Sequence, residues 1–178
     1  MEDLCLEMIS AVEAGAFQLA LFGALTLPDI CSSLEASNGE TNRLRYIAWW
    51  DRELGSRYRP PRTIQLQSGM HEVPGLNGAT AYKLRCRILH QHRSVLADTK
   101  LTTARIIFVL PNSMSFHQNS ADDVYMVDLS MFVRDVADAT IQWLQRTQGS
   151  EPFETNYSAG LKLRPEGLSP YLTGLPIS

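Results

Sequence analysis

A 15-residue apolar run near the N-terminus constrains the fold of this chain more than any other feature. The run, AGAFQLALFGALTLP at 14–28, contains no charged residue and lies between Glu13 and Asp29. It is shorter than the roughly 20 apolar residues that a helix needs to cross a bilayer. A helix that is apolar on nearly every side is buried at the centre of a domain or against another subunit. The run therefore predicts a central helix of the core and no membrane span.

The composition is that of one compact domain. The chain has 178 residues, of which 44% are hydrophobic, and this is enough to bury a sizeable core. The formal net charge of -3 gives no strongly basic nucleic-acid footprint at the scale of the whole chain. Among the cations, 13 arginines stand against 3 lysines. Because arginine presents a planar fork to carboxylates and phosphates, this bias favours anion contacts, although a GC-rich genome gives the same bias.

The three cysteines, Cys5, Cys31 and Cys86, are far apart in the sequence and odd in number, which does not fit a disulfide framework. Each has apolar neighbours, so we expect buried free thiols and a reducing compartment. Glu2 and Asp3 stand where a signal peptide carries basic residues. The expected location is the cytoplasm.

Periodicity predicts two helical stretches before residue 40. Residues 1–27 read as one helix that Pro28 breaks or kinks. Asp29 then falls in the first turn of the stretch that follows, where a carboxylate favours the positive end of a helix.

A third helix is expected over 41–58. In it Leu44, Ile47 and Ala48 follow the three-four step of an inward face. The neighbouring Trp49 and Trp50 add a large apolar surface for the core or for a dimer contact, a more frequent use of tryptophan than base stacking.

A loop is expected over 59–78, with a short extended piece at 63–66, because this stretch is rich in proline and glycine and has no sustained period. Loops of this length are uncommon in compact domains and are often functional. A fourth helix is expected over 81–94, capped near 77–80.

The C-terminal part predicts a hairpin and a last helix. TARIIFVLP at 103–111 is the best strand pattern, and DDVYMVDLS at 122–130 is its expected hairpin partner. A final amphipathic helix is expected over 129–148, with Ser130 as its cap. Its expected inner face consists of Leu129, Phe132, Val133, Val136 and Leu144.

The predicted organisation is a mainly α-helical bundle of about five helices with one small β-hairpin. It spans 1–148 as a single domain, with the hairpin at about 103–129, and 149–178 forms a proline-rich C-terminal tail.

Several chemistries lack their sequence patterns. The chain has no GxxxxGK[ST] or GxGxxG phosphate loop, no HExxH, no GxSxG and no EF-hand pattern. His90 and His92 are two residues apart and leave a helix on different faces, so they make a poor metal pair. We expect no metal and no cofactor. His71 and His117 lie in predicted loops and are expected at the surface without a role.

The candidate site is the fourth helix, AYKLRCRILHQHRS at 81–94. On a helix Ala81, Leu84 and Ile88 form the inward stripe. Arg85 and His90 are five residues apart, which places them about 140° apart around the axis, a separation that a long arginine can bridge. A guanidinium can bind a phosphate through two hydrogen bonds and stabilise its added charge, and a histidine can move a proton at neutral pH. Together these suffice for metal-independent cleavage of RNA through a 2′,3′-cyclic phosphate.

The stretch RCRILH, with Arg85, four intervening residues and His90, resembles the R-x(4–6)-H motif of HEPN (higher eukaryotes and prokaryotes nucleotide-binding) domains. The resemblance extends to YKLRCRILHQ, to LPDICSSLE upstream and to the final helix, about two-thirds of the chain as helix order. It implies a small helical bundle, a homodimer that joins two motifs in one cleft, and a metal-independent endoribonuclease in toxin–antitoxin or phage-defence systems. Around the catalytic pair, Lys83, Arg87, His92 and Arg93 would line the approach and hold RNA backbone charge.

Two alternatives remain open at the level of sequence. The motif also fits Arg87 with His92, and Arg85 with His92. The cluster can equally be structural, with its cations paired to carboxylates such as Asp29, Glu35 or Asp51 of neighbouring helices. In that case the bundle is a non-catalytic interaction module, an antitoxin or accessory factor that binds a protein partner. The net acidity, Cys86 directly after Arg85 and the proline-rich tail favour this alternative.

Overall fold

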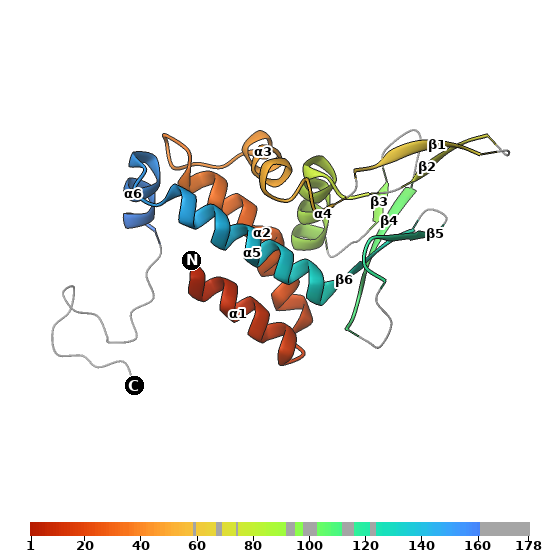
Figure 1. Ribbon diagram of the computed structural model, residues 1–178, viewed down its shortest axis with the longest axis horizontal. Helices are drawn as coiled ribbons and strands as arrows, with labels where there is room; N and C mark the ends of the chain where they lie inside the picture. Colours follow the sequence, from red (N-terminus) through yellow and green to blue (C-terminus); the bar gives the residue numbers. More distant parts are fainter. Residues whose placement is uncertain are drawn as a thin grey trace.

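The computed structural model describes residues 1–58, 60–66, 69–73, 75–91, 95–97, 103–111, 116–121 and 124–160. The helices are α1 (Glu2–Glu13), α2 (Phe17–Leu34), α3 (Arg43–Glu53), α4 (Gly78–Gln91), α5 (Leu129–Thr147) and α6 (Glu151–Ser158). The strands are β1 (Arg62–Leu66), β2 (Gly69–Val73), β3 (Val95–Ala97), β4 (Thr103–Val109), β5 (Asn119–Ala121) and β6 (Val124–Asp128). The prediction of a mainly α-helical fold with a small β element is confirmed. The helices gather on one side of the molecule and the strands on the other (Figure 1).

Helix α2 lies at the centre of the helices, as the apolar run predicts. It packs against α1, α3, α4, α5 and α6, and only Gln18 and Leu19 of its residues are exposed. With 18 residues and a mean hydropathy of 1.3, α2 also has the length and composition of a membrane span, and half of it is buried inside the protein. The core helix of a soluble protein has the same length and composition.

The chain breaks between α1 and α2 at Gly15, and the prediction of one helix over 1–27 is wrong. Gly15 has a φ of 76°, a left-handed conformation that glycine adopts without strain. Pro28 lies inside α2, which continues to Leu34, so the proline does not end the helix and Asp29 is an interior residue rather than a first-turn residue.

A contact from α3 supports the turn of α2 that precedes Pro28. Proline has no N–H and its ring crowds the preceding turn, which weakens backbone hydrogen bonds there. The hydroxyl of Tyr46 donates to the Leu25 carbonyl at 3.2 Å and is itself buried. The carbonyl that Pro28 leaves without its helical donor is that of Ala24, so Tyr46 binds the neighbouring carbonyl of the same turn.

Helix α3 begins at an asparagine cap, with the amide of Arg45 donating to Asn42 Oδ1 at 3.0 Å. Its buried face consists of Tyr46, Trp49 and Trp50. Trp49 and Trp50 are 1% and 0% exposed, which confirms their place in the core. Leu44 is 75% exposed and Ala48 is exposed as well, so the predicted inward positions of these two residues are wrong. The aromatic residues displace the leucine from the core because they bury more apolar area per side chain.

The four-stranded sheet has the order β3-β4-β6-β5, and the predicted hairpin of 103–111 with 122–130 is wrong. Strands β4 and β6 are parallel, with Ile106 opposite Tyr125. The antiparallel partner of β6 is the short β5, where Ala121 pairs with Val124. Alternation of apolar and polar residues identifies a strand but does not fix its direction, and this is why the prediction failed.

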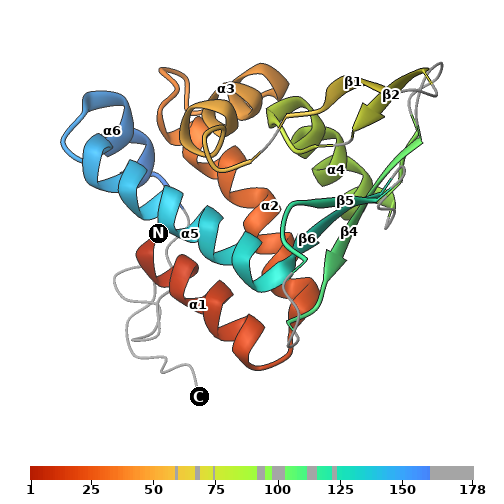
Figure 2. The same cartoon turned by 45° about the vertical axis from the view of Figure 1, so that its right-hand side comes forward.

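A two-stranded antiparallel ribbon occupies the predicted loop of 59–78. Strand β1 contains the expected extended piece and pairs with β2, with Gln65 opposite Met70. The ribbon projects from the end of the molecule away from α6, as two views show (Figures 1 and 2). The described part of the chain therefore contains antiparallel pairs of consecutive strands at β1–β2, β3–β4 and β5–β6, and the first of them lies where a loop is predicted.

Helix α5 has the predicted inner face, and all five of its predicted residues, Leu129, Phe132, Val133, Val136 and Leu144, are buried. Its cap is Asp128, whose Oδ1 accepts the Met131 amide at 3.0 Å, and not Ser130. The start of the predicted tail folds as α6, because Phe153 is 2% exposed and packs edge-on against Trp143 at 5.7 Å. Residues 161–178 of that tail lie outside the described residues.

Candidate functional site

Helix α4 is fixed at its N-terminus by two side chains. The amide of Thr80 donates to Asn77 Oδ1 at 2.9 Å, which places the cap where it is predicted. The amide of Gly78 donates to Asp51 Oδ1 of α3 at 2.7 Å. The predicted inward stripe of Ala81, Leu84 and Ile88 is buried. The stripe and the cap together determine which side of α4 faces the other helices.

Arg85 forms an ion pair with Asp29 of α2. Arg85 Nε lies 2.8 Å from Asp29 Oδ2, and the two side chains are 22% and 12% exposed. The Nε–H bond does not point along this line, so the contact is electrostatic and not an aligned hydrogen bond. Burial raises the pKa of Asp29, and the Arg85 charge opposes this rise. Arg85 Nη1 also lies 3.8 Å from Cys86 Sγ.

The carboxylate that pairs with Arg85 is one of those that the sequence suggests as structural partners of this helix. Asp29 pairs with the arginine, and Asp51 caps α4 through Gly78. The structural interpretation of Arg85 is therefore correct for one edge of its guanidinium. The side chain keeps some exposure, so this contact does not enclose the whole guanidinium.

His90 lies in the last turn of α4 and is exposed. No hydrogen bond or ion pair joins the described side chains of Arg85 and His90, which leave the helix about 140° apart. One chain therefore holds the arginine towards α2 and presents the histidine to solvent.

Of the other predicted site residues, the structure describes two and leaves two outside the described residues. Lys83 is exposed and Arg87 is half-buried on the same helix, and both have contacts of their own. His92 and Arg93 lie outside the described residues, and so do the two alternative motif registers that use His92.

A partly buried cluster around Asp135 of α5 is absent from the sequence-based predictions. Tyr58 donates its hydroxyl to Asp135 Oδ2 at 2.9 Å, and Arg57 Nη1 donates to Oδ1 at 3.0 Å. His117 Nε2 lies 3.7 Å from Oδ2, and the histidine side chain is only 9% exposed. The expectation that His117 lies at the surface is wrong. Its partners are far away in the sequence, so no local pattern could reveal them.

The cluster joins α5 to the segment at Arg57 and Tyr58 and to the segment at His117. We interpret it as a structural contact and not as a proton donor for a ligand. His117 Nδ1 is buried and has no hydrogen-bond partner among the described residues. Burial lowers the pKa of His117, and the charges of Asp135 and Asp128 oppose this effect. The histidine is thus neutral at pH 7, in contact with one carboxylate.

The cluster predicts a pH dependence of stability. Because the pKa of His117 is lower in the folded state than the value of about 6.5 in an unfolded chain, the unfolded state takes up the proton first as pH falls. We expect the free energy of unfolding of the wild type to fall, relative to that of a His117→Gln variant, from about pH 6.5 downward. Urea unfolding of both proteins across this range measures the difference. A difference that is constant with pH would contradict the burial of a neutral imidazole.

The ion pair of Arg85 with Asp29 predicts that substitutions of these two residues have coupled effects on the free energy of unfolding. Asp29→Asn leaves the half-buried charge of Arg85 without its partner, and we expect the free energy of unfolding to fall by about 2 kcal/mol. Combined with Arg85→Met, the loss should be smaller than the sum of the two single losses, since the double variant has no unpaired charge. Urea unfolding of the four proteins of the cycle tests this expectation. Strictly additive losses would show that the two side chains do not interact.

No metal site is formed by the described residues, in the sense that no three or more His, Cys, Asp or Glu side chains converge. Comparisons with protein-family models, with curated proteins and with solved structures give no match for this chain.

Proposed function

We propose that this protein binds RNA with helix α4 and cleaves it without a metal, as a HEPN-like endoribonuclease. Arg85 holds the scissile phosphate and His90 moves the proton. The observation that supports this proposal is the ion pair of Arg85, which fixes one edge of the guanidinium on Asp29 while the side chain stays 22% exposed. An arginine held at one edge keeps N–H groups of its fork for a phosphate.

The proposed reaction uses the ribose as the nucleophile. His90 accepts the proton of a 2′-hydroxyl, the 2′-oxygen bonds to phosphorus, and the bond to the 5′-oxygen breaks. The leaving 5′-oxygen takes the proton back from protonated His90, which is neutral again, and the products are a 2′,3′-cyclic phosphate and a 5′-hydroxyl. Arg85 balances the charge that develops on the phosphate oxygens. Lys83 and Arg87 of the same helix, with His92 and Arg93 beyond it, hold neighbouring backbone phosphates.

A homodimer is part of the proposal. In one chain Arg85 and His90 point about 140° apart, so a second copy that brings its own α4 to the site supplies the second group. The resemblance to HEPN domains implies such a dimer and a role in a toxin or in phage defence. The cytoplasm is the proposed location, supported by the buried free thiols of Cys5 and Cys31.

The test is incubation of the purified protein with a mixed RNA pool in EDTA, followed by analysis of the new ends. We expect 2′,3′-cyclic phosphate ends from RNA and no cleavage of DNA, which has no 2′-hydroxyl. Absence of cleavage at high protein concentration, with the dimer confirmed by light scattering, would overturn the catalytic proposal.

A second candidate function is a non-catalytic interaction module, such as an antitoxin or accessory factor that binds a protein. The ion pair with Asp29 favours it as well, because a carboxylate inside the same chain offsets the positive charge that a phosphate needs. The two candidates differ in one outcome. An interaction module shows no cyclic-phosphate ends at any concentration, and the loss of stability in Asp29→Asn is expected for both candidates.

A further inference from the structure

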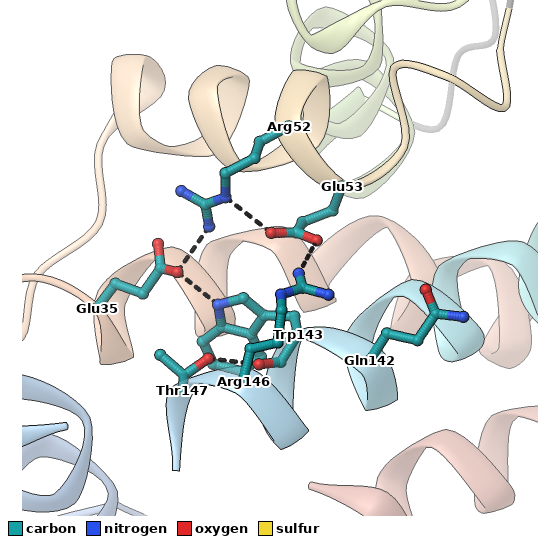
Figure 3. A pocket seen from close by; sticks show the side chains of 7 residues that line it. All are labelled: Glu35, Arg52, Glu53, Gln142, Trp143, Arg146 and Thr147. Atoms are coloured by element: carbon teal, nitrogen blue, oxygen red, sulfur yellow. Dashed lines mark hydrogen bonds and ion pairs between the residues drawn. The ribbon is translucent and has the colours of Figure 1, made fainter. Parts of the chain in front are cut away.

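A hollow of about 530 Å³ lies where the C-terminal ends of α2 and α3 meet the last turns of α5. Figure 3 shows the side chains around it, which come from α3, from α5 and from the residue that follows α2. Its lining consists of Glu35, Arg52, Glu53, Gln142, Trp143, Arg146 and Thr147. The size is that of a site for a small molecule. The hollow shares no residue with the candidate site on α4.

Four charged side chains of alternating sign form a ladder along this hollow. Arg52 Nη2 donates to Glu35 Oε1 at 2.6 Å, and Arg52 Nε donates to Glu53 Oε1 at 2.7 Å. Arg146 Nη2 donates to the other oxygen of Glu53, Oε2. Both guanidiniums therefore bind the same carboxylate, one at each oxygen, with Glu53 between them (Figure 3).

Each carboxylate of the ladder accepts two hydrogen bonds from side chains of the hollow. The Glu53 side chain is only 7% exposed, and each of its oxygens accepts from an arginine. Glu35 Oε1 accepts from Arg52 and also from the indole Nε1 of Trp143 at 2.5 Å. The contacts given occupy both oxygens of Glu53 and Oε1 of Glu35, and the charge of both carboxylates is balanced by the two arginines.

Both arginines have N–H groups that the contacts above do not use. Each guanidinium carries five N–H groups, and the contacts above use two from Arg52 and one from Arg146. The two side chains are 50% and 57% exposed. Gln142 lies one helical turn before Arg146 on the same face of α5 and adds an amide. The C-terminal ends of α3 and α5 favour cations at these positions, and the exposure of both side chains leaves their remaining N–H groups accessible from solvent.

From this inventory we infer that the hollow is a binding site for the phosphate or carboxylate group of a small organic anion, anchored by Arg146 and Arg52. A guanidinium pairs with two oxygens of such a group at once. Glu53 holds both forks in place before the ligand arrives, so less side-chain entropy is lost on binding. The inference does not rest on the proposed function, because it uses neither α4 nor RNA.

The test is thermal unfolding of the full chain in potassium phosphate, potassium acetate or potassium chloride at equal ionic strength. At about ten times its dissociation constant, a bound anion should raise the Tm by about 3–5 °C over the value in chloride. A rise in phosphate alone identifies phosphate esters as the ligand class, and a rise in both salts extends the class to carboxylates. No rise in either salt would overturn the inference.

Matched variants locate the effect. Arg146→Gln and Arg52→Gln should remove the rise, whereas Arg43→Gln, an equal change of charge at an exposed position of α3, should keep it. A rise that survives in both pocket variants would overturn the assignment to this hollow.

A second measurement on the wild type avoids any loss of stability in the variants. The indole N–H resonance of Trp143, which donates to Glu35 at the hollow, should shift during a phosphate titration. The indole resonances of Trp49 and Trp50, which do not line the hollow, serve as internal controls. Equal shifts of all three resonances would contradict a site at this place.

Discussion

His90→Ala is expected to lower the rate of RNA cleavage by about 10²–10⁴-fold, the usual contribution of a positioned general acid or base. The fold should be unaffected, since His90 is exposed at the last turn of α4. The measurement is single-turnover cleavage of RNA in EDTA by the variant and the wild type, with circular dichroism of both proteins.

A second variant separates proton transfer from binding. Lys83→Ala removes an exposed cation of the same helix and should raise KM with little change in kcat, because a phosphate contact away from the bond that breaks acts equally on substrate and transition state. Cleavage by the His90→Ala protein at the wild-type rate would show that another group moves the proton.

Trp50→Ala is expected to lower the free energy of unfolding by about 3–5 kcal/mol, the cost of truncating a large aromatic side chain in a packed core. Trp50 is 0% exposed and packs on Tyr46, Tyr58 and Phe132, with ring centroids 6.0–6.3 Å away. This set joins α3 to α5 and to the segment before β1. Urea unfolding followed by far-ultraviolet circular dichroism measures the loss.

Phenylalanine substitutions test the reason for that loss. The indole Nε1 of Trp50 is buried without a hydrogen-bond partner among the described residues, so Trp50→Phe removes an unsatisfied donor and should cost less than about 2 kcal/mol. Trp143 is equally buried, but its Nε1 donates to Glu35. Trp143→Phe should therefore cost about 1 kcal/mol more than Trp50→Phe. The reverse order would mean that packing alone, and not the hydrogen bond, decides the cost.

The helices in which apolar residues recur every three to four positions could be predicted from the sequence, because those apolar residues form the face that packs in the core. The inner face of α5 and the buried stripe of α4 are correct for this reason. The errors arise where distant residues decide. Tyr46 supports the turn of α2 before Pro28, and the pairing of β6 with both β4 and β5 sets a strand direction that no local alternation contains.

The same limit applies to the sites. Arg85 and its possible carboxylate partners could be named in advance, because helix order brings a small number of acidic residues near α4. The cluster around Asp135 could not, since Tyr58 and His117 are 77 and 18 positions away in the chain. Nor could the hollow near Glu53, whose second arginine is 93 positions away. Charged residues that pair across such long separations in the chain do not follow any fixed sequence spacing, so no motif predicts them.

The packing of α5 against both α1 and α2 also has a consequence for the synthesis of the chain. The ribosome completes α2 at Leu34 and reaches the end of α5 at Thr147, an interval of about 6–23 seconds at typical rates of about 5–20 residues per second. During this interval the most apolar helix of the protein lacks its last large covering element. The nascent chain is then most prone to aggregate, and the translation rate, rather than any helix propensity, sets how long that exposure lasts.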